Sequence, residues 1–282
     1  MIPPASPARQ ALAQFARNPV GMTGLIVLLA IILLSLLGPA WYGGDPFDLV
    51  GAPFSPPGDG APLGTDYLGR DVLAGLLVGG RASLAVGLVA ALISVVIGVS
   101  VGALAGWYGG WVDRALMKGT EFFQVLPALL FAMVLVALFG AKLGVETLAI
   151  GLVSWTGVAR LTRGECLRLR ELDYVRSTIA AGAAPRYVVV RVVLPNALPP
   201  IIVAATLAIG VAILFEGGLS FLGLGDPNVM TWGLMLGQNR SYLQDAWWAV
   251  TFPGAAIFLA VLAVSLLGDG INDALNPRLR RR

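Results

Sequence analysis

Six apolar stretches dominate the sequence, and most of them are long enough to cross a lipid bilayer as a helix. They cover residues 20–40, 82–107, 122–139, 143–158, 197–215 and 246–267. A helix needs about 20 mainly apolar residues to cross about 30 Å of hydrocarbon. The fourth stretch is the weakest, because it is short and carries Glu146 near one end. These stretches predict an all-α, polytopic membrane protein with about six transmembrane helices.

The composition supports a membrane protein and argues against an enzyme. Hydrophobic residues make up 57% of the 282 residues and charged residues only 12%, whereas soluble domains average about 25% charged residues. Histidine is absent, which removes the commonest metal ligand and the commonest general base. Cys166 is the single cysteine and cannot form an internal disulfide. We therefore expect no catalytic, cofactor-binding or metal site in this chain.

The placement of lysine and arginine predicts the orientation of the chain. On one side of the six expected spans the polar segments hold only Arg70, Arg81, Lys142 and Arg240, while the other fifteen of the nineteen basic residues lie on the opposite side. Cytoplasmic segments carry an excess of basic residues, so both termini are expected in the cytoplasm. The first stretch exceeds a usual signal-peptide core and no A-x-A site follows Leu37, so we expect it to be retained.

The expected organisation follows from these spans. It comprises a cytoplasmic N-terminus (1–19), a first transmembrane helix (20–40), an extracytoplasmic loop (41–81), a core of five helices (82–270) and a cytoplasmic tail (271–282). The core includes a cytoplasmic segment (162–195) and a glycine-rich extracytoplasmic loop (216–245). The second and fifth spans are rich in small residues, which allow close packing of membrane helices.

The cytoplasmic segment is expected to form a helix–turn–helix outside the bilayer. Residues 165–184 read as one helix with an apolar face formed by Leu172, Val175, Ile179 and Ala183, since these recur at spacings of three and four. Gly182 can adopt a left-handed turn, and Pro185 suits the start of a second short helix. We expect that second helix to end near Leu194 and Pro195, where the fifth span begins. The corner could dock into another protein, or the segment could be a connector resting on lipid headgroups.

This segment resembles the cytoplasmic coupling loop of bacterial ABC importer permeases. The family pattern is E-A-A, three residues, Gly, nine residues and then I-x-L-P. Here the nine residues 183–191 follow Gly182, and the sequence VVLP comes next at 192–195. Arg176, Ser177 and Thr178 stand where the family has Glu-Ala-Ala. The resemblance implies contacts with an ATPase at Asp173, Tyr174, Arg176, Ser177, Thr178, Ala181, Gly182, Ala183, Leu194 and Pro195.

Further stretches resemble the dipeptide and oligopeptide permeases, specifically the second of their two pore subunits. These stretches are residues 62–73 (PLGTDYLGRDVL), 219–225 (LSFLGLG) with Trp232-Gly233, 252–254 (FPG), 266–270 (LLGDG) and 273–278 (DALNPR). The resemblance implies import of short peptides across the cytoplasmic membrane of a bacterium by ATP-driven alternating access. Related permeases carry nickel chelates or glutathione, which remain alternative substrates.

The resemblance also implies the partners of this chain. They are a homologous second permease subunit, two cytoplasmic ABC ATPases, an extracytoplasmic substrate-binding protein and membrane lipid, without nucleic acid. The chain lacks a G-x-x-x-x-G-K-[ST] loop, because its only lysines, Lys118 and Lys142, follow Met117 and Ala141. ATP and Mg²⁺ are therefore expected on the partner ATPases, and none is expected on this chain.

Two functions of other classes remain to be weighed. An ion-coupled secondary transporter usually has a carboxylate or a broken helix near the bilayer midplane, whereas Glu146, Glu216, Asp245 and Asp269 are expected near span ends. An intramembrane enzyme would need paired carboxylates or a Ser–Lys pair inside the membrane, and both lysines fall outside the expected spans.

Residues of the outer segments carry weaker hypotheses. Glu216, Ser220, Phe221, Gly223 and Gly225 are candidates for facing a receptor or forming a gate, although a solvated Glu216 at the interface is the alternative. Asp66, Arg70 and Asp71 are expected to hold the outer loop by ion pairing. The terminal run Arg280-Arg281-Arg282 is expected to rest on anionic headgroups.

Overall fold

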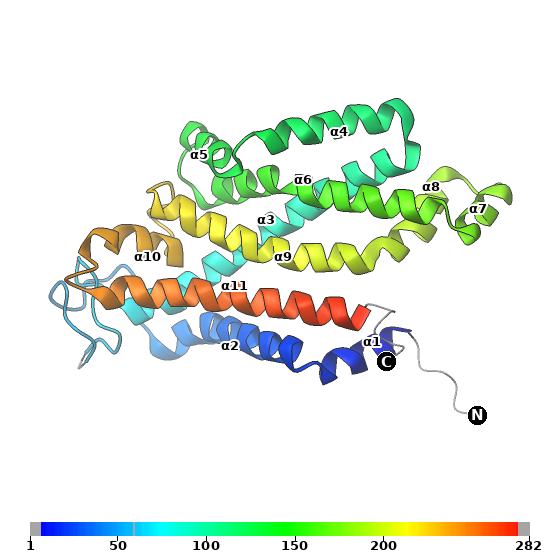
Figure 1. Cartoon of the computed structure of the whole chain (residues 1–282). Helices are drawn as coiled ribbons and strands as arrows, with labels where there is room; N and C mark the ends of the chain where they lie inside the picture. Colours follow the sequence, from blue (N-terminus) through cyan, green and yellow to red (C-terminus); the bar gives the residue numbers. More distant parts are fainter. Residues whose placement is uncertain (1–6, 59, 276–282) are drawn as a thin grey trace.

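The computed structural model describes residues 7–58 and 60–275, which form an elongated bundle of helices (Figure 1). The elements are α1 (Pro7–Arg17), α2 (Pro19–Tyr42), α3 (Val72–Tyr108), α4 (Gly110–Val125), α5 (Ala128–Phe139), α6 (Leu143–Arg170), α7 (Asp173–Ala180), α8 (Pro185–Tyr187), the π-helix η1 (Val188–Val193), α9 (Leu194–Phe221), α10 (Trp232–Asn239), the 3₁₀-helix η2 (Arg240–Tyr242) and α11 (Trp247–Leu275). Within the described ranges the chain forms no strand, and three isolated bridges occur in the loop between α2 and α3. The all-α prediction is confirmed.

The bundle has two distinct ends. The long loop of residues 43–71 and α10 lie at one end, on the left in Figure 1, and α1, α7 and α8 lie at the other. We call these the loop end and the elbow end. The ends of α1 and α11 are tied together, because the amide of Asn18 donates to Asp273 Oδ2 at 3.0 Å. The expected lipid contact of Arg280, Arg281 and Arg282 lies outside the described residues.

By length and apolarity alone, fewer helices of the described residues qualify as membrane spans than the six expected from the sequence. Among the described residues, four helical units have the length and apolarity to cross a membrane, namely α2, α3, the continuous unit Pro185–Phe221 and α11. The pair α4 and α5 makes a fifth if it is counted as one span. The expected span 143–158 lies in α6, which is 28 residues long but falls short of the same apolarity because of residues such as Glu146 and Arg160.

The prediction of one uninterrupted span at residues 122–139 is wrong. α4 and α5 meet at an angle of 85°, and the break falls at Leu126 and Pro127, which have extended backbone angles. Proline has no N–H to continue the helix and disfavours helical geometry at the residue before it. Pro127 therefore divides an apolar run that composition alone presents as continuous.

Two helices extend beyond their predicted limits at the loop end. α3 begins at Val72, ten residues earlier than expected, because Asp71 caps it by accepting from the N–H groups of Leu73 (2.8 Å) and Ala74 (3.4 Å). α9 continues to Phe221, so that the first residues of the expected loop 216–245 are helical. α10 occupies a further part of that loop.

Glycine allows α3 and α6 to approach each other closely. Gly98, Gly102 and Gly106 follow one another at intervals of four on α3, and a Cβ at Gly102 would lie 2.3 Å from the carbonyl oxygen of Ala159. A Cβ at Gly98 would lie 2.7 Å from the carbonyl oxygen of Trp155. This is the close packing by small residues that is typical of membrane helices, as the composition of the second span predicted.

Candidate coupling elbow and outer clasp

The elbow is the exposed segment 171–187 between α6 and η1, and it contains two breaks. α6 ends at Arg170, and Leu172 is extended (φ −77°, ψ 144°) before α7 begins at Asp173. The prediction of a single helix over 165–184 is therefore wrong. Asp173 lies in the first turn of α7, where a carboxylate interacts favourably with the positive end of the helix dipole.

The end of α7 is a tight turn built around Gly182. Gly182 has a φ of +84°, a left-handed conformation that costs a side chain about 1–2 kcal/mol. Its N–H donates to the carbonyl oxygen of Ile179 at 2.9 Å, and the N–H of Ala183 donates to that of Thr178 at 3.3 Å. These two bonds form a Schellman motif, which satisfies carbonyl groups left free at the helix end. The predicted role of Gly182 in a left-handed turn is confirmed.

A single buried side chain holds α7 to the bundle. Val175 is fully buried in a core cluster with Val188 and Val193 of η1 and with Cys166 and Leu169 of α6. Leu172 and Ile179, the neighbours of Val175 on the predicted apolar face, are instead exposed by 38% and 42%. α7 is thus anchored to α6 and η1 on one side and presents apolar surface to the exterior on the other.

The other residues predicted to contact an ATPase are mostly gathered on the elbow. Arg176 forms an ion pair with Glu171, and Thr178 donates from Oγ1 to the carbonyl oxygen of Tyr174 at 2.7 Å. Ser177 and Ala181 are exposed and Ala183 is half-buried. Every one of these residues lies within the segment between the end of α6 and the start of α8.

Leu194 and Pro195 do not belong to the elbow, and the helix does not end there as predicted. The unit Pro185–Phe221 is continuous. Pro195 has no N–H and would interrupt a regular α-helix, but the π-helical turn Val188–Val193 precedes it, in which the N–H of Leu194 donates five residues back to Val189. The side chain of Asn196 donates to the carbonyl oxygen of Val192 at 2.7 Å. The elbow is therefore connected to α9 by unbroken helix.

The residues proposed to face a receptor are divided between the surface and the interior. Phe221 and Gly223 are exposed, whereas Ser220 and Gly225 are buried. Glu216 is also fully buried, at 0% exposure, so the alternative of a solvated Glu216 is wrong. Its carboxylate accepts from Ser83 and Ser220 at 3.1 Å each. The sequence missed this polar cluster, whose only signal is a glutamate within an apolar run.

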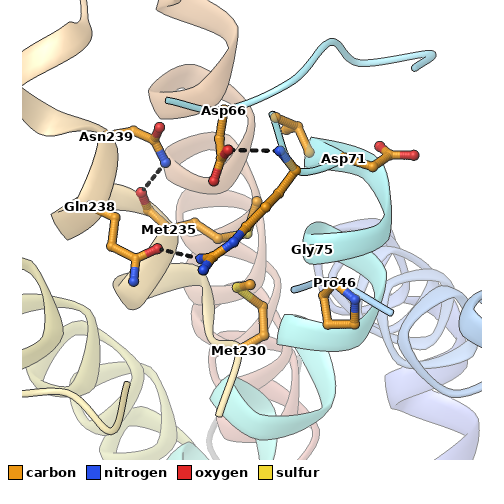
Figure 2. Close-up of a pocket in the computed structure, with 10 residues that line it drawn as sticks. Pro46, Asp66, Asp71, Gly75, Met230, Met235, Gln238 and Asn239 are labelled. Atoms are coloured by element: carbon orange, nitrogen blue, oxygen red, sulfur yellow. Dashed lines mark hydrogen bonds between the residues drawn. The ribbon is translucent and has the colours of Figure 1, made fainter. Parts of the chain in front are cut away.

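Asp66, Tyr67 and Arg70 of the 43–71 loop lie against α10 at the loop end, and we call this arrangement the outer clasp (Figure 2). Asp66 Oδ1 accepts from the N–H groups of Leu68 (2.8 Å) and Arg70 (2.9 Å). The Nη1 of Arg70 donates to Oε1 of Gln238, a residue of α10, at 3.4 Å. The N–H of Tyr67 donates to Asn239 Oδ1 at 3.3 Å.

The clasp is held differently from the prediction of ion pairing. None of the three ion pairs in the described part of the chain includes Asp66, Arg70 or Asp71. Asp71 caps α3 and accepts from Tyr42 Oη at 2.5 Å, while the guanidinium of Arg70 lies 5.2 Å from the centre of the Phe47 ring. These residues hold the loop, as expected, but through hydrogen bonds and a cation–π contact.

An ion pair that the sequence did not reveal joins α4 and α6. Arg163 donates from Nε and Nη2 to the two carboxylate oxygens of Asp113, at 2.5 and 2.6 Å. This two-point geometry fixes the orientation of both side chains. It also holds α4 against the half of α6 that leads to the elbow.

Comparison with known proteins identifies the family. Residues 98–281 match the model of the binding-protein-dependent transport system inner membrane component, and residues 6–57 match the N-terminal transmembrane domain of oligopeptide transport permease C. The chain is 39% identical to the di/tripeptide transport system permease protein DppC of Pseudomonas aeruginosa (strain UCBPP-PA14), covering 98% of this chain and 93% of that protein. It is 40% identical to the dipeptide transport system permease protein DppC of Escherichia coli (strain K12), covering 99% and 95%.

A solved structure shows the same fold. The match is to an inward-facing conformation of the MetNI methionine ABC transporter, with a TM-score of 0.57 and 20% identity, covering 72% of this chain and 96% of that one.

The family match decides against an ion-coupled secondary transporter and an intramembrane enzyme. The chain belongs to the binding-protein-dependent transport system inner membrane components and is a permease subunit of an ABC importer.

Proposed function

We propose that this chain is one of two pore-forming subunits in an importer that carries short peptides into a bacterial cell. The relatives named as dipeptide and di/tripeptide permeases match nearly the whole chain, which supports a peptide substrate. The observation that carries the mechanical part of the proposal is the anchored elbow. Its exposed face is available to a partner, and its buried Val175 is packed against two helices of the bundle.

The elbow would act as a lever. Two ATPase subunits would bind ATP and Mg²⁺ and dock on the exposed face of α7, including Tyr174 and Ser177. Their closure would move α7, and Val175 would transmit that movement to η1 and α6. Because η1 continues into α9 without a break, displacement at the elbow end would reach the loop end. The proposed result is alternation between inward-facing and outward-facing states.

The loop end would receive a substrate-binding protein. The outer clasp fixes the 43–71 loop against α10, so it offers the receptor a defined surface in place of a flexible loop. Phe221 and Gly223 are exposed nearby at the end of α9. Glu216 and Ser220 are buried and would influence this end from the inside, without touching the receptor.

The orientation proposed from the basic residues places the elbow end in the cytoplasm. The described ends of α1 and α11 are tied at the same end as α7, through Asn18 and Asp273. This arrangement is the one required for both termini to lie with the elbow on the cytoplasmic side of the inner membrane. The second permease subunit would pack beside this chain within the membrane.

Transport by the purified complex tests the proposal. The complex is isolated in mild detergent, its chains are identified, and it is reconstituted in vesicles that contain ATP and carry the substrate-binding protein outside. We expect two ATPases and a second permease to co-purify, and labelled dipeptide uptake to persist when ionophores collapse ion gradients. Competition with a nickel chelate and with glutathione tests the alternative cargoes. Uptake that requires an ion gradient while ATP is present would contradict the proposal.

A further inference from the structure

Two glutamates from different helices share one serine hydroxyl in the interior of the loop end. Ser220 Oγ lies 3.1 Å from Glu216 Oε1 and 3.4 Å from Glu146 Oε1. Both glutamates are completely buried, and Ser220 is 2% exposed. Glu146 comes from the first turn of α6, and Glu216 from the last turns of α9. The cluster therefore joins two helices that pack against each other.

Hydrogen bonding on the far side of Glu216 is complete. The N–H of Trp232 donates to Ser83 Oγ at 3.1 Å, and Ser83 is 3.1 Å from Glu216 Oε2. Ser83 therefore accepts from the N–H of Trp232 and donates to Glu216 Oε2. Glu216 thus has a partner at Oε2 from α3 and another at Oε1 from Ser220, so neither of its carboxylate oxygens is left without a hydrogen bond.

The contact between Glu146 and Ser220 lacks a proton if both glutamates are ionised. An ionised carboxylate only accepts hydrogen bonds, and a serine hydroxyl has one proton to donate. If Ser220 donates to Glu216, then the close approach of Glu146 requires Glu146 to be the donor. Moreover, Oε2 of Glu146 has no hydrogen-bond partner at all, although burying an unpaired ionised oxygen is costly.

The surrounding charges give no compensation for two negative groups. Besides Glu216, the charged group that acts on Glu146 is the carboxylate of Asp226, whose Oδ2 accepts from the N–H of Leu143 at 3.2 Å. α5 and α10 carry no charged residue. On α3, Arg81 is bound to carbonyl oxygens of α2, and Lys142 forms none of the ion pairs found in the described residues.

We propose that Glu146 is a proton-binding site, and that its proton completes a chain of hydrogen bonds from Glu146 through Ser220 to Glu216. We call this chain of hydrogen bonds the relay. The relay connects α6 to α9, and Ser83 and Trp232 extend it to α3 and α10. Loss of the proton would place two like charges on either side of one hydroxyl and would remove the bond between α6 and α9. Alkaline conditions would therefore loosen the loop end. This inference is independent of which cargo the importer carries.

Infrared spectroscopy of the intact complex tests the inference directly. A buried protonated carboxyl gives a C=O stretching band that is separate from the bands of ionised carboxylates. We expect this band at neutral pH, its disappearance under alkaline conditions, and its loss in Glu146→Gln. The control Glu121→Gln, which changes an exposed glutamate of α4, is expected to leave the band unchanged. A band that persists in Glu146→Gln, or a wild-type spectrum without one, would overturn the proposal.

Thermal stability supplies a second measurement on the same complex. Glutamine can donate to Ser220 as the protonated glutamate does, so Glu146→Gln should keep the neutral-pH melting temperature and abolish its alkaline decrease. Stabilisation of the wild type by added sodium, without a protonated-carboxyl band, would assign the site to a metal cation. That result would overturn the proposal that Glu146 binds a proton. If Glu146→Gln does not assemble, Ser220→Ala keeps both carboxyls and should shift the band without removing it; an unshifted band would contradict the relay.

Discussion

The N–H of Ala183 donates to the carbonyl oxygen of Thr178 across the turn at Gly182. This bond closes the elbow and requires a left-handed residue between its partners. We predict that Gly182→Val blocks ATP-driven uptake while the chain still inserts and assembles, because a Cβ at this position meets nothing within 4 Å in the chain itself. Gly182→Asn should retain more transport, since asparagine tolerates the left-handed region. Uptake of a labelled dipeptide, measured at equal expression of the two variants, checks both predictions.

The matched control is Gly164→Val, at an exposed glycine of α6 whose Cβ would also meet open space. Its φ is not left-handed, so no comparable backbone strain arises. Equal loss of transport in Gly164→Val and Gly182→Val would show that bulk anywhere on this surface is harmful and would remove the special role of the turn.

A second prediction concerns the packing of α3 on α6. A Cβ at Gly102 would lie only 2.3 Å from the carbonyl oxygen of Ala159, so Gly102→Ala forces the helices apart. Overpacking of this kind typically costs about 1–3 kcal/mol. The free energy of unfolding in mixed micelles should fall by this amount. Gly157→Ala, on an open face of α6, should not lower it, since alanine favours a helix interior over glycine. A stable Gly102→Ala would contradict the close approach.

A third prediction uses the link between α2 and α3. Pro39 has no N–H, which leaves the carbonyl of Ser35 without its helical partner, and Arg81 Nε donates to that oxygen at 2.8 Å. Arg81→Ala should destabilise the chain by about 1–3 kcal/mol, the typical cost of an unpaired buried polar group. Pro39→Ala restores an N–H, so the double variant should be less destabilised than the sum of the single variants. Simple additivity would show that the two residues are not coupled in this way.

Much of the helical arrangement could be predicted from the sequence, because apolar length and small-residue spacing are local properties. The turn at Gly182 is also a local feature, since glycine readily adopts a left-handed conformation and Pro185 disfavours helical geometry at Ala184. The break at Pro127 carried the same kind of local signal, but the surrounding apolar run obscured it. The continuation of helix through Pro195 was not predictable, because it depends on the π-helical turn that precedes the proline.

The polar interior of the loop end could not be predicted from one sequence. Glu146 and Glu216 lie in separate apolar runs, and only the packing of α6 against α9 brings both to Ser220. The ion pair between Asp113 and Arg163 likewise joins residues that are distant in the sequence. Each charge alone is typical of a span end. Their burial depends on tertiary contacts that a local pattern does not contain.

A fourth prediction tests the outer clasp. Asp66→Ala removes the acceptor for the N–H groups of Leu68 and Arg70, so the 43–71 loop should become sensitive to limited proteolysis. Asp66→Asn keeps an acceptor oxygen and should remain more resistant. Asp48→Ala, at an exposed position of the same loop, serves as the control. Full resistance of Asp66→Ala would show that the clasp does not depend on these bonds.

Site-specific cross-linking of the elbow tests the central claim most directly. Cys166, the only native cysteine, is fully buried, so a cysteine introduced at the exposed Ser177 is a specific probe, and Ser241→Cys is its exposed counterpart at the loop end. Ser177→Cys should react only from the cytoplasmic side and cross-link to the ATPase with a yield that changes on nucleotide binding. Ser241→Cys should react from outside and form no such cross-link. Reaction of Ser177→Cys with an impermeant reagent applied outside intact cells would contradict the account.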